Sequence, residues 1–171
     1  MLASPKINKI TRKVASSIAF YPVLIAICLT LLAVIVMWLE YKPWVVELKP
    51  HFKVVLVKSI EDARLLLGTI VASVITLMVF SFSMVMVVLN QASSNLSPRL
   101  LPGLITHKDN QVVLGCYLGT ICYCLIVILN FQPNAEQFNI PSLGVFVGLI
   151  LGLVCLSLFA FFIHSISLSI Q

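Results

Sequence analysis

Four long stretches of the chain carry no charged side chain, and they constrain its fold more than any other feature. They run over residues 14–39, 65–98, 110–135 and 137–171. Each is longer than the roughly 20 residues that a helix needs to cross the hydrocarbon of a bilayer. We therefore expect an all-α integral membrane protein, a four-helix transmembrane bundle, with helices near 18–39, 67–89, 111–129 and 143–163.

The composition supports lipid as the surrounding medium. Hydrophobic residues make up 60% of the chain and charged residues 10%, whereas soluble domains are about 45–50% apolar and about 25% charged. So few charges cannot provide the polar surface that a water-soluble globule needs. The lipid bilayer is therefore the first partner that we expect.

Basic residues cluster directly before the first apolar stretch, at Lys6, Lys9, Arg12 and Lys13. Such a cluster is typical of the side of a membrane helix that stays in the cytoplasm. We expect a cytoplasmic N-terminus, an external loop over residues 40–64 and a multi-pass protein of the cell membrane. Because the cluster adjoins a hydrophobic segment, we read the net charge of +5 as an insertion signal and expect no nucleic-acid binding.

The cysteines all lie within apolar stretches, at Cys28, Cys116, Cys122, Cys124 and Cys155. Disulfide frameworks and zinc sites use cysteines paired at short spacings in polar loops. We interpret these residues as small hydrophobic side chains that pack between helices. No metal site and no cofactor are expected.

The second apolar stretch carries a stripe of polar side chains at helical spacing. It comprises Thr69, Ser73, Thr76, Ser83, Asn90 and Ser94. At about 100° per residue these positions fall in one sector of a helix, which in lipid favours a pore lining or a contact with another helix. Phe80 and Val87 interrupt the same sector, which favours helix packing over a pore.

Glycines recur at four-residue spacing in the third and fourth stretches. They are Gly115 and Gly119 in the third, and Gly144, Gly148 and Gly152 in the fourth. This spacing clears one side of a membrane helix and lets another backbone approach closely. We interpret both sets as packing surfaces, whose partner could lie within the chain or in another subunit.

Three further polar residues, Gln91, Arg99 and His164, are expected at the cytoplasmic interface. Gln91 and Arg99 flank a dense polar run that reads as a helix exit, a lipid-headgroup site or an ion vestibule. The sequence contains no phosphate-binding glycine loop, zinc-protease pattern or nucleophile elbow. It also places no acidic or basic residue within an expected span, which disfavours ion-coupled transporters. We expect no enzyme activity from this chain.

Several segments together resemble a known family. They are residues 17–24 (SIAFYPVL), 62–73 (DARLLLGTIVAS), 91–101 (QASSNLSPRLL), 111–120 (QVVLGCYLGT) and 162–171 (FIHSISLSIQ). Their order resembles the bacterial predicted-membrane-protein family known as domain of unknown function 2254. Ser165 stands where members of that family often have a second histidine after the one matching His164.

The resemblance implies four N-terminal membrane helices, a location in the bacterial cytoplasmic membrane and a soluble C-terminal region that this chain lacks. It implies no activity. From the stripe we form a first hypothesis, a homo-oligomeric channel-like or transport-associated protein with the second helix at a pore or subunit interface. The second hypothesis is a membrane anchor or scaffold for a cytoplasmic domain.

Overall fold

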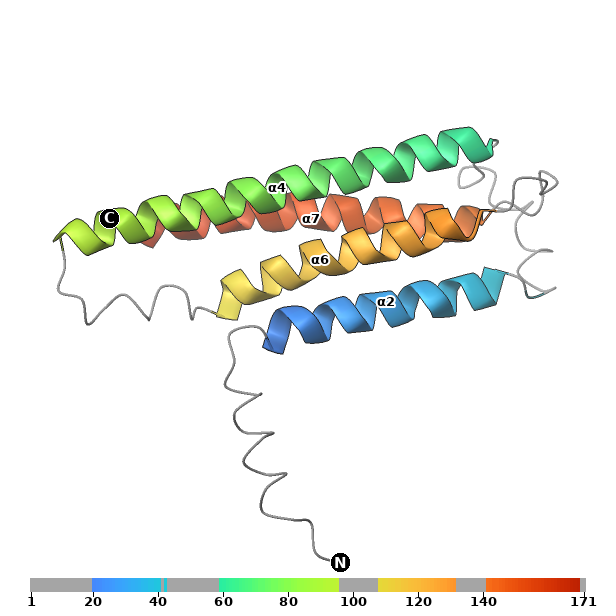
Figure 1. Cartoon of the computed structure of the whole chain (residues 1–171), viewed down its shortest axis with the longest axis horizontal. Helices are drawn as coiled ribbons and strands as arrows, with labels where there is room; N and C mark the ends of the chain where they lie inside the picture. The colour runs from blue at the N-terminus through green and yellow to red at the C-terminus, as the bar shows by residue number, and fades with distance from the viewer. Residues whose placement is uncertain (1–19, 41, 43–58, 96–107, 132–140, 170–171) are drawn as a thin grey trace, which may run out of the picture.

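The fold consists of four long helices, and the expected all-α class is confirmed (Figure 1). The computed structural model describes residues 20–40, 42, 59–95, 108–131 and 141–169. Its helices are α2 (Phe20–Glu40), α4 (Ile60–Asn95), α6 (Lys108–Leu129) and α7 (Ser142–Ser169). Successive helices run in opposite directions, so α2 and α6 point one way and α4 and α7 the other (Figure 1).

Each helix contains a segment long and apolar enough to cross a bilayer. The four segments are Phe20–Glu40, Ile60–Val88, Asn110–Leu129 and Ser142–Ile166. At 1.5 Å per residue, the 20 residues of the α6 segment give a length of about 30 Å, which matches the hydrocarbon thickness. The structure therefore has the expected architecture of a four-helix transmembrane bundle.

Helix α6 occupies the centre of the bundle. It packs against α2, α4 and α7, and 44% of its membrane segment is buried inside the chain, compared with 11% for α4 and 22% each for α2 and α7. Its inward side chains join two apolar clusters, one around Tyr123 and Val127 and one around Tyr117. Helix α4 is thus the least covered of the four.

Helix α4 is longer than the span expected over 67–89, and the loop expected over 40–64 is correspondingly shorter. At its start, the Ser59 hydroxyl accepts a hydrogen bond from the Glu61 N–H (3.2 Å), as an N-cap residue does. Glu61 and Asp62 occupy the first turn, where negative charge is favourable. These capping residues explain why the helix begins at Ile60.

One end of the bundle, called the Glu40 end here, is held by charged residues that contact helix termini. The buried Glu40 carboxylate accepts hydrogen bonds from the N–H groups of Leu143 (3.3 Å) and Gly144 (3.2 Å) in the first turn of α7. The Arg64 guanidinium donates to the Phe131 carbonyl just after α6 (3.5 Å). Carboxylates stabilise helix N-termini and cations stabilise C-termini.

Gly144 is held from two sides at this end. Its N–H donates to Glu40, and its carbonyl accepts a hydrogen bond from the Tyr123 hydroxyl (3.0 Å). The end of α2 and the start of α7 therefore meet the last two turns of α6 through polar contacts inside an apolar cluster. Hydrogen bonds to a charged group contribute about 1.5–3 kcal/mol each.

We expect Glu40→Ala to lower the unfolding free energy by about 2–4 kcal/mol, because it leaves one buried and one part-buried N–H group without their acceptor. Glu40→Gln keeps one acceptor oxygen and should cost less. Thermal unfolding in mild detergent measures both. The control is Glu61→Ala, which removes an exposed carboxylate from the first turn of α4. If the Glu40 and Glu61 variants unfolded at the same temperature, the account of this end would be wrong.

Candidate functional site

The polar stripe lies on the outer face of α4. Thr69, Ser73, Thr76, Ser83 and Asn90 are all exposed, whereas Leu67, Val74 and Val88 of the same helix are buried against its neighbours. The stripe therefore faces the surroundings of the bundle. Ser94 and Gln91 also belong to α4, but their side chains are outside the described part of the chain.

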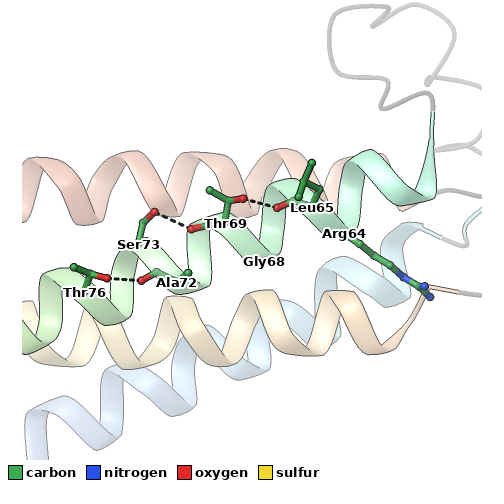
Figure 2. A pocket seen from close by; sticks show the side chains of 7 residues that line it. All are labelled: Arg64, Leu65, Gly68, Thr69, Ala72, Ser73 and Thr76. Carbon is green, nitrogen blue, oxygen red and sulfur yellow. Dashed lines mark hydrogen bonds between the residues drawn. The ribbon is translucent and has the colours of Figure 1, made fainter.

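The hydroxyl groups of the stripe are satisfied by their own helix. Each donates to the carbonyl four residues earlier: Thr69 to Leu65 (2.7 Å), Ser73 to Thr69 (2.8 Å), Thr76 to Ala72 (2.9 Å) and Ser83 to Val79 (2.9 Å). Figure 2 shows the first three of these bonds. Because such bonds satisfy the donors of these four hydroxyls, their side chains can face lipid or another helix without an unpaired O–H group.

The half of the stripe nearest the Glu40 end is hollowed. A shallow, open depression of about 500 Å³ is lined by Arg64, Leu65, Gly68, Thr69, Ala72, Ser73 and Thr76 (Figure 2). Gly68 forms its floor, and a Cβ added there would meet nothing within 4 Å. The Arg64 side chain extends away from the three hydroxyls (Figure 2) and reaches the Phe131 carbonyl. We call this surface the α4 hollow.

The other half of the stripe is bulky. Phe80 is 53% exposed and packs edge-on against Phe159 of α7, with ring centroids 5.7 Å apart. Val79 and Val87 are 60% and 51% exposed. The interruption expected at Phe80 and Val87 is therefore present, and small side chains dominate only between Gly68 and Thr76.

Gly115 and Gly119 bring α2 close to α6. A Cβ added at Gly115 would lie 2.9 Å from the Pro22 Cα, and one at Gly119 would lie 2.9 Å from the Leu29 Cβ. Real Cβ atoms almost never approach other atoms so closely. The two helices can pack at this distance only because α6 has no side chain at these positions.

The glycines of α7 face α6 and α4. A Cβ added at Gly144 would lie 3.3 Å from Val127, one at Gly148 would lie 2.7 Å from Leu67, and one at Gly152 would lie 3.1 Å from Ile70. The structure thus places all five sequence-predicted glycines against helices of the same chain. Gly68 differs from them, because its open side has no neighbour.

The remaining sequence-predicted positions are dispersed. His164 is exposed near the end of α7, and Arg99 lies outside the described residues. Cys124 and Cys155 are buried, Cys116 and Cys122 are half-buried, and Cys28 is exposed. None of the five forms a disulfide. In the described ranges, no three His, Cys, Asp or Glu residues gather closely enough to hold a metal ion.

The sequence interpretation missed Gly68, Ala72 and Glu40. Gly68 and Ala72 are separated by four residues, so the small-residue spacing that identified the other glycines also applies to this pair. Glu40 was assigned to a loop because it is the first charge after a long apolar run. Its contact with α7 joins residues about 100 positions apart in the sequence, and no local pattern indicates it.

The fold and the outward stripe define a multi-pass membrane protein whose α4 helix is the least covered by its neighbours. The chain belongs to the family described as "Predicted membrane protein (DUF2254)", whose model matches residues 15–171. Uncharacterized proteins of Mycobacterium bovis and Mycobacterium tuberculosis are 32% identical to it over 112 residues. The match covers 64% of this chain but only 21% of each relative. No solved structure is significantly similar to the chain.

The contrast between the packed glycines and Gly68 gives a direct test. We expect Gly115→Ala to lower the unfolding free energy by about 1–3 kcal/mol, the usual cost of overpacking, because its Cβ would press on the Pro22 backbone. Gly68→Ala adds the same methyl group where no other atom of the chain lies within 4 Å, so it should not weaken the packing within one chain. Chemical or thermal unfolding in detergent measures both. Equal losses for the two variants would contradict the packing described here.

Proposed function

We propose that this chain is the membrane-embedded part of a homo-oligomeric, channel-like or transport-associated protein of the bacterial cytoplasmic membrane. Helix α4 would lie at the subunit interface or pore. The observation that carries the proposal is the α4 hollow, an uncovered surface on the least buried helix in which small side chains follow Arg64 and Leu65. The proposal assigns no chemical reaction to the chain.

The first argument is that membrane helices associate where small residues let backbones approach closely. Within this chain that mechanism is used at five glycines. Gly68 and Ala72 offer the same kind of surface on α4, and α4 is buried over only 11% of its membrane segment. The simplest partner for this surface is a second copy of the same chain.

The second argument concerns conduction. The exposed hydroxyls of Thr69, Ser73, Thr76 and Ser83 point outward, so they can line a pore only where several copies place α4 around a common axis. Rings of neutral oxygen atoms can conduct ions without titratable groups. The hydroxyls bonded to their own helix still have acceptor lone pairs to offer.

A second candidate function is a membrane anchor or scaffold for a soluble domain. It is favoured by the relatives, because most of each mycobacterial protein lies outside the matched region. In this case the bundle would hold and orient a neighbouring domain, and the α4 hollow would be a lipid-facing surface. The basic N-terminal cluster supports a cytoplasmic N-terminus under either candidate.

We expect Ala72→Leu to weaken association, because a bulky side chain would fill the α4 hollow and separate neighbouring helices. Two populations labelled with donor and acceptor dyes and reconstituted together should lose at least half of their energy transfer. The matched control is Ala160→Leu, the same change at an exposed alanine of α7, which should leave the transfer intact. Equal transfer for both variants would exclude α4 from the interface.

Pore function has a separate test. We expect the combined substitutions Ser73→Leu, Thr76→Leu and Ser83→Leu to reduce ion flux into proteoliposomes by at least tenfold, since they replace hydroxyl oxygens with apolar carbon. The control is Ser157→Leu on α7, an exposed serine that also bonds its own helix (3.0 Å to Leu153). Unchanged flux in the triple variant would rule out a pore lined by α4.

The anchor candidate is tested by replacing the four helices, in a full-length family member, with an unrelated membrane anchor of the same oligomeric state. Preserved cellular function would support an anchor. Loss of function, with the soluble region still folded and at the membrane, would contradict it.

A further inference from the structure

Helix α2 carries a row of large apolar side chains on its outer face. They are Ile27, Leu31, Ile35 and Trp38, and each is more than half exposed. Their spacing of three or four residues places them on one side of the helix. At 1.5 Å per residue, the row is about 17 Å long. We call it the α2 ridge.

The α2 ridge lies at the same depth in the bundle as the α4 hollow. Met37 of α2 and Ala63 of α4 belong to one apolar cluster near the Glu40 end. From there α2 and α4 both extend toward the other end, because they run in opposite directions (Figure 1). The hollow, from Arg64 to Thr76, is about 18 Å long by the same rise per residue. The two surfaces therefore match in depth and in length.

The two surfaces belong to opposite sides of the bundle. Helix α6 lies between α2 and α4 and packs against both (Figure 1), so a chain cannot place its own ridge in its own hollow. Copies of a membrane protein insert in one orientation, and a rotation about the membrane normal leaves every residue at its depth. A neighbouring copy can therefore present its ridge to this hollow.

We propose that the α2 ridge of one copy fills the α4 hollow of the next. The proposal rests on the oligomer proposed above and names the surface that α4 meets. The shared depth brings Leu31 opposite Leu65, Gly68, Thr69 and Ala72, which all line the hollow. Four residues at this spacing form the hole that accepts a knob from a neighbouring helix. A contact between unlike surfaces, repeated by rotation, generates a ring.

Charges at the Glu40 end are complementary in this arrangement. Lys42 follows the end of α2, whereas Glu61 and Asp62 are exposed in the first turn of α4. Opposite charges across a contact fix its register. A symmetric contact between two α4 helices would instead bring the acidic first turns together, while Arg64 is engaged with the Phe131 carbonyl of its own chain. The charges therefore favour α2 as the partner of α4.

The test exchanges the large and the small side chain of the contact. Ala72→Leu fills the hollow and should lower energy transfer between labelled, co-reconstituted copies by at least half. Adding Leu31→Ala to the same chain removes the knob that the new side chain meets, so the double variant should recover most of the transfer. The matched control adds Leu156→Ala instead, at an exposed leucine of α7, and should recover none.

The outcomes separate this contact from the oligomer itself. A double variant that transfers no better than Ala72→Leu alone would overturn the α2 contact and leave the oligomer standing. An unmodified chain without energy transfer would show that lipid covers the hollow, and the proposed oligomer would fail together with this contact.

A second set of variants tests the charges. Lys42→Glu in one population, and Glu61→Lys with Asp62→Lys in another, should each weaken association within that population, because like charges then meet. A mixture of the two populations again places opposite charges at every contact between unlike copies and should restore the transfer. A mixture that transfers no more than either population alone would overturn the contact between α2 and α4.

Discussion

The packing of α2 against α6 depends on the absence of side chains at Gly115 and Gly119. At these positions the Pro22 backbone and the Leu29 side chain occupy the space that a Cβ would need. Without a hydrophobic effect between helices in lipid, such close contact is what holds membrane helices together. Because α6 meets α2 on this side and α7 and α4 on others, the remaining architecture follows from its central position.

Charge is confined to the ends of the bundle and acts there on helix termini. The Glu40 carboxylate accepts hydrogen bonds from N–H groups in the first turn of α7. The Arg64 guanidinium donates to the carbonyl of Phe131, just after the end of α6. Backbone groups at helix ends have no intrahelical partner, so a contact from a neighbouring helix satisfies them and fixes how the helices align. At the same end, the Lys42 Nζ lies 4.2 Å from the centroid of the Trp38 ring and makes a cation–π contact with it.

Much of the fold could be predicted from the sequence because long charge-free stretches leave few alternatives to membrane helices. The helical period likewise predicts that Thr69, Ser73 and Thr76 share one face, as they do. It cannot predict the length of α4, because uncharged polar residues up to Asn95 continue the helix. Nor can it predict the Glu40 contact with α7, which brings distant segments together.

Spacing also cannot tell which helix a glycine meets. Gly148 packs on Leu67 of the same chain, whereas Gly68 faces open space, yet both precede a small residue at the fourth position. Only the structure shows that Gly148 packs within the chain and that Gly68 is open to a partner. That distinction assigns the glycines of α6 and α7 to packing within the chain and leaves the α4 hollow as the proposed subunit contact.

Native mass spectrometry of the unmodified chain released from nanodiscs tests the central claim most directly. If the α4 hollow is a subunit interface around a pore, the spectrum should show one discrete assembly of three or more copies. A dimer would keep the α4 contact but contradict the pore. A clean monomer would contradict the proposed oligomer and leave α4 facing lipid, as the anchor candidate has it.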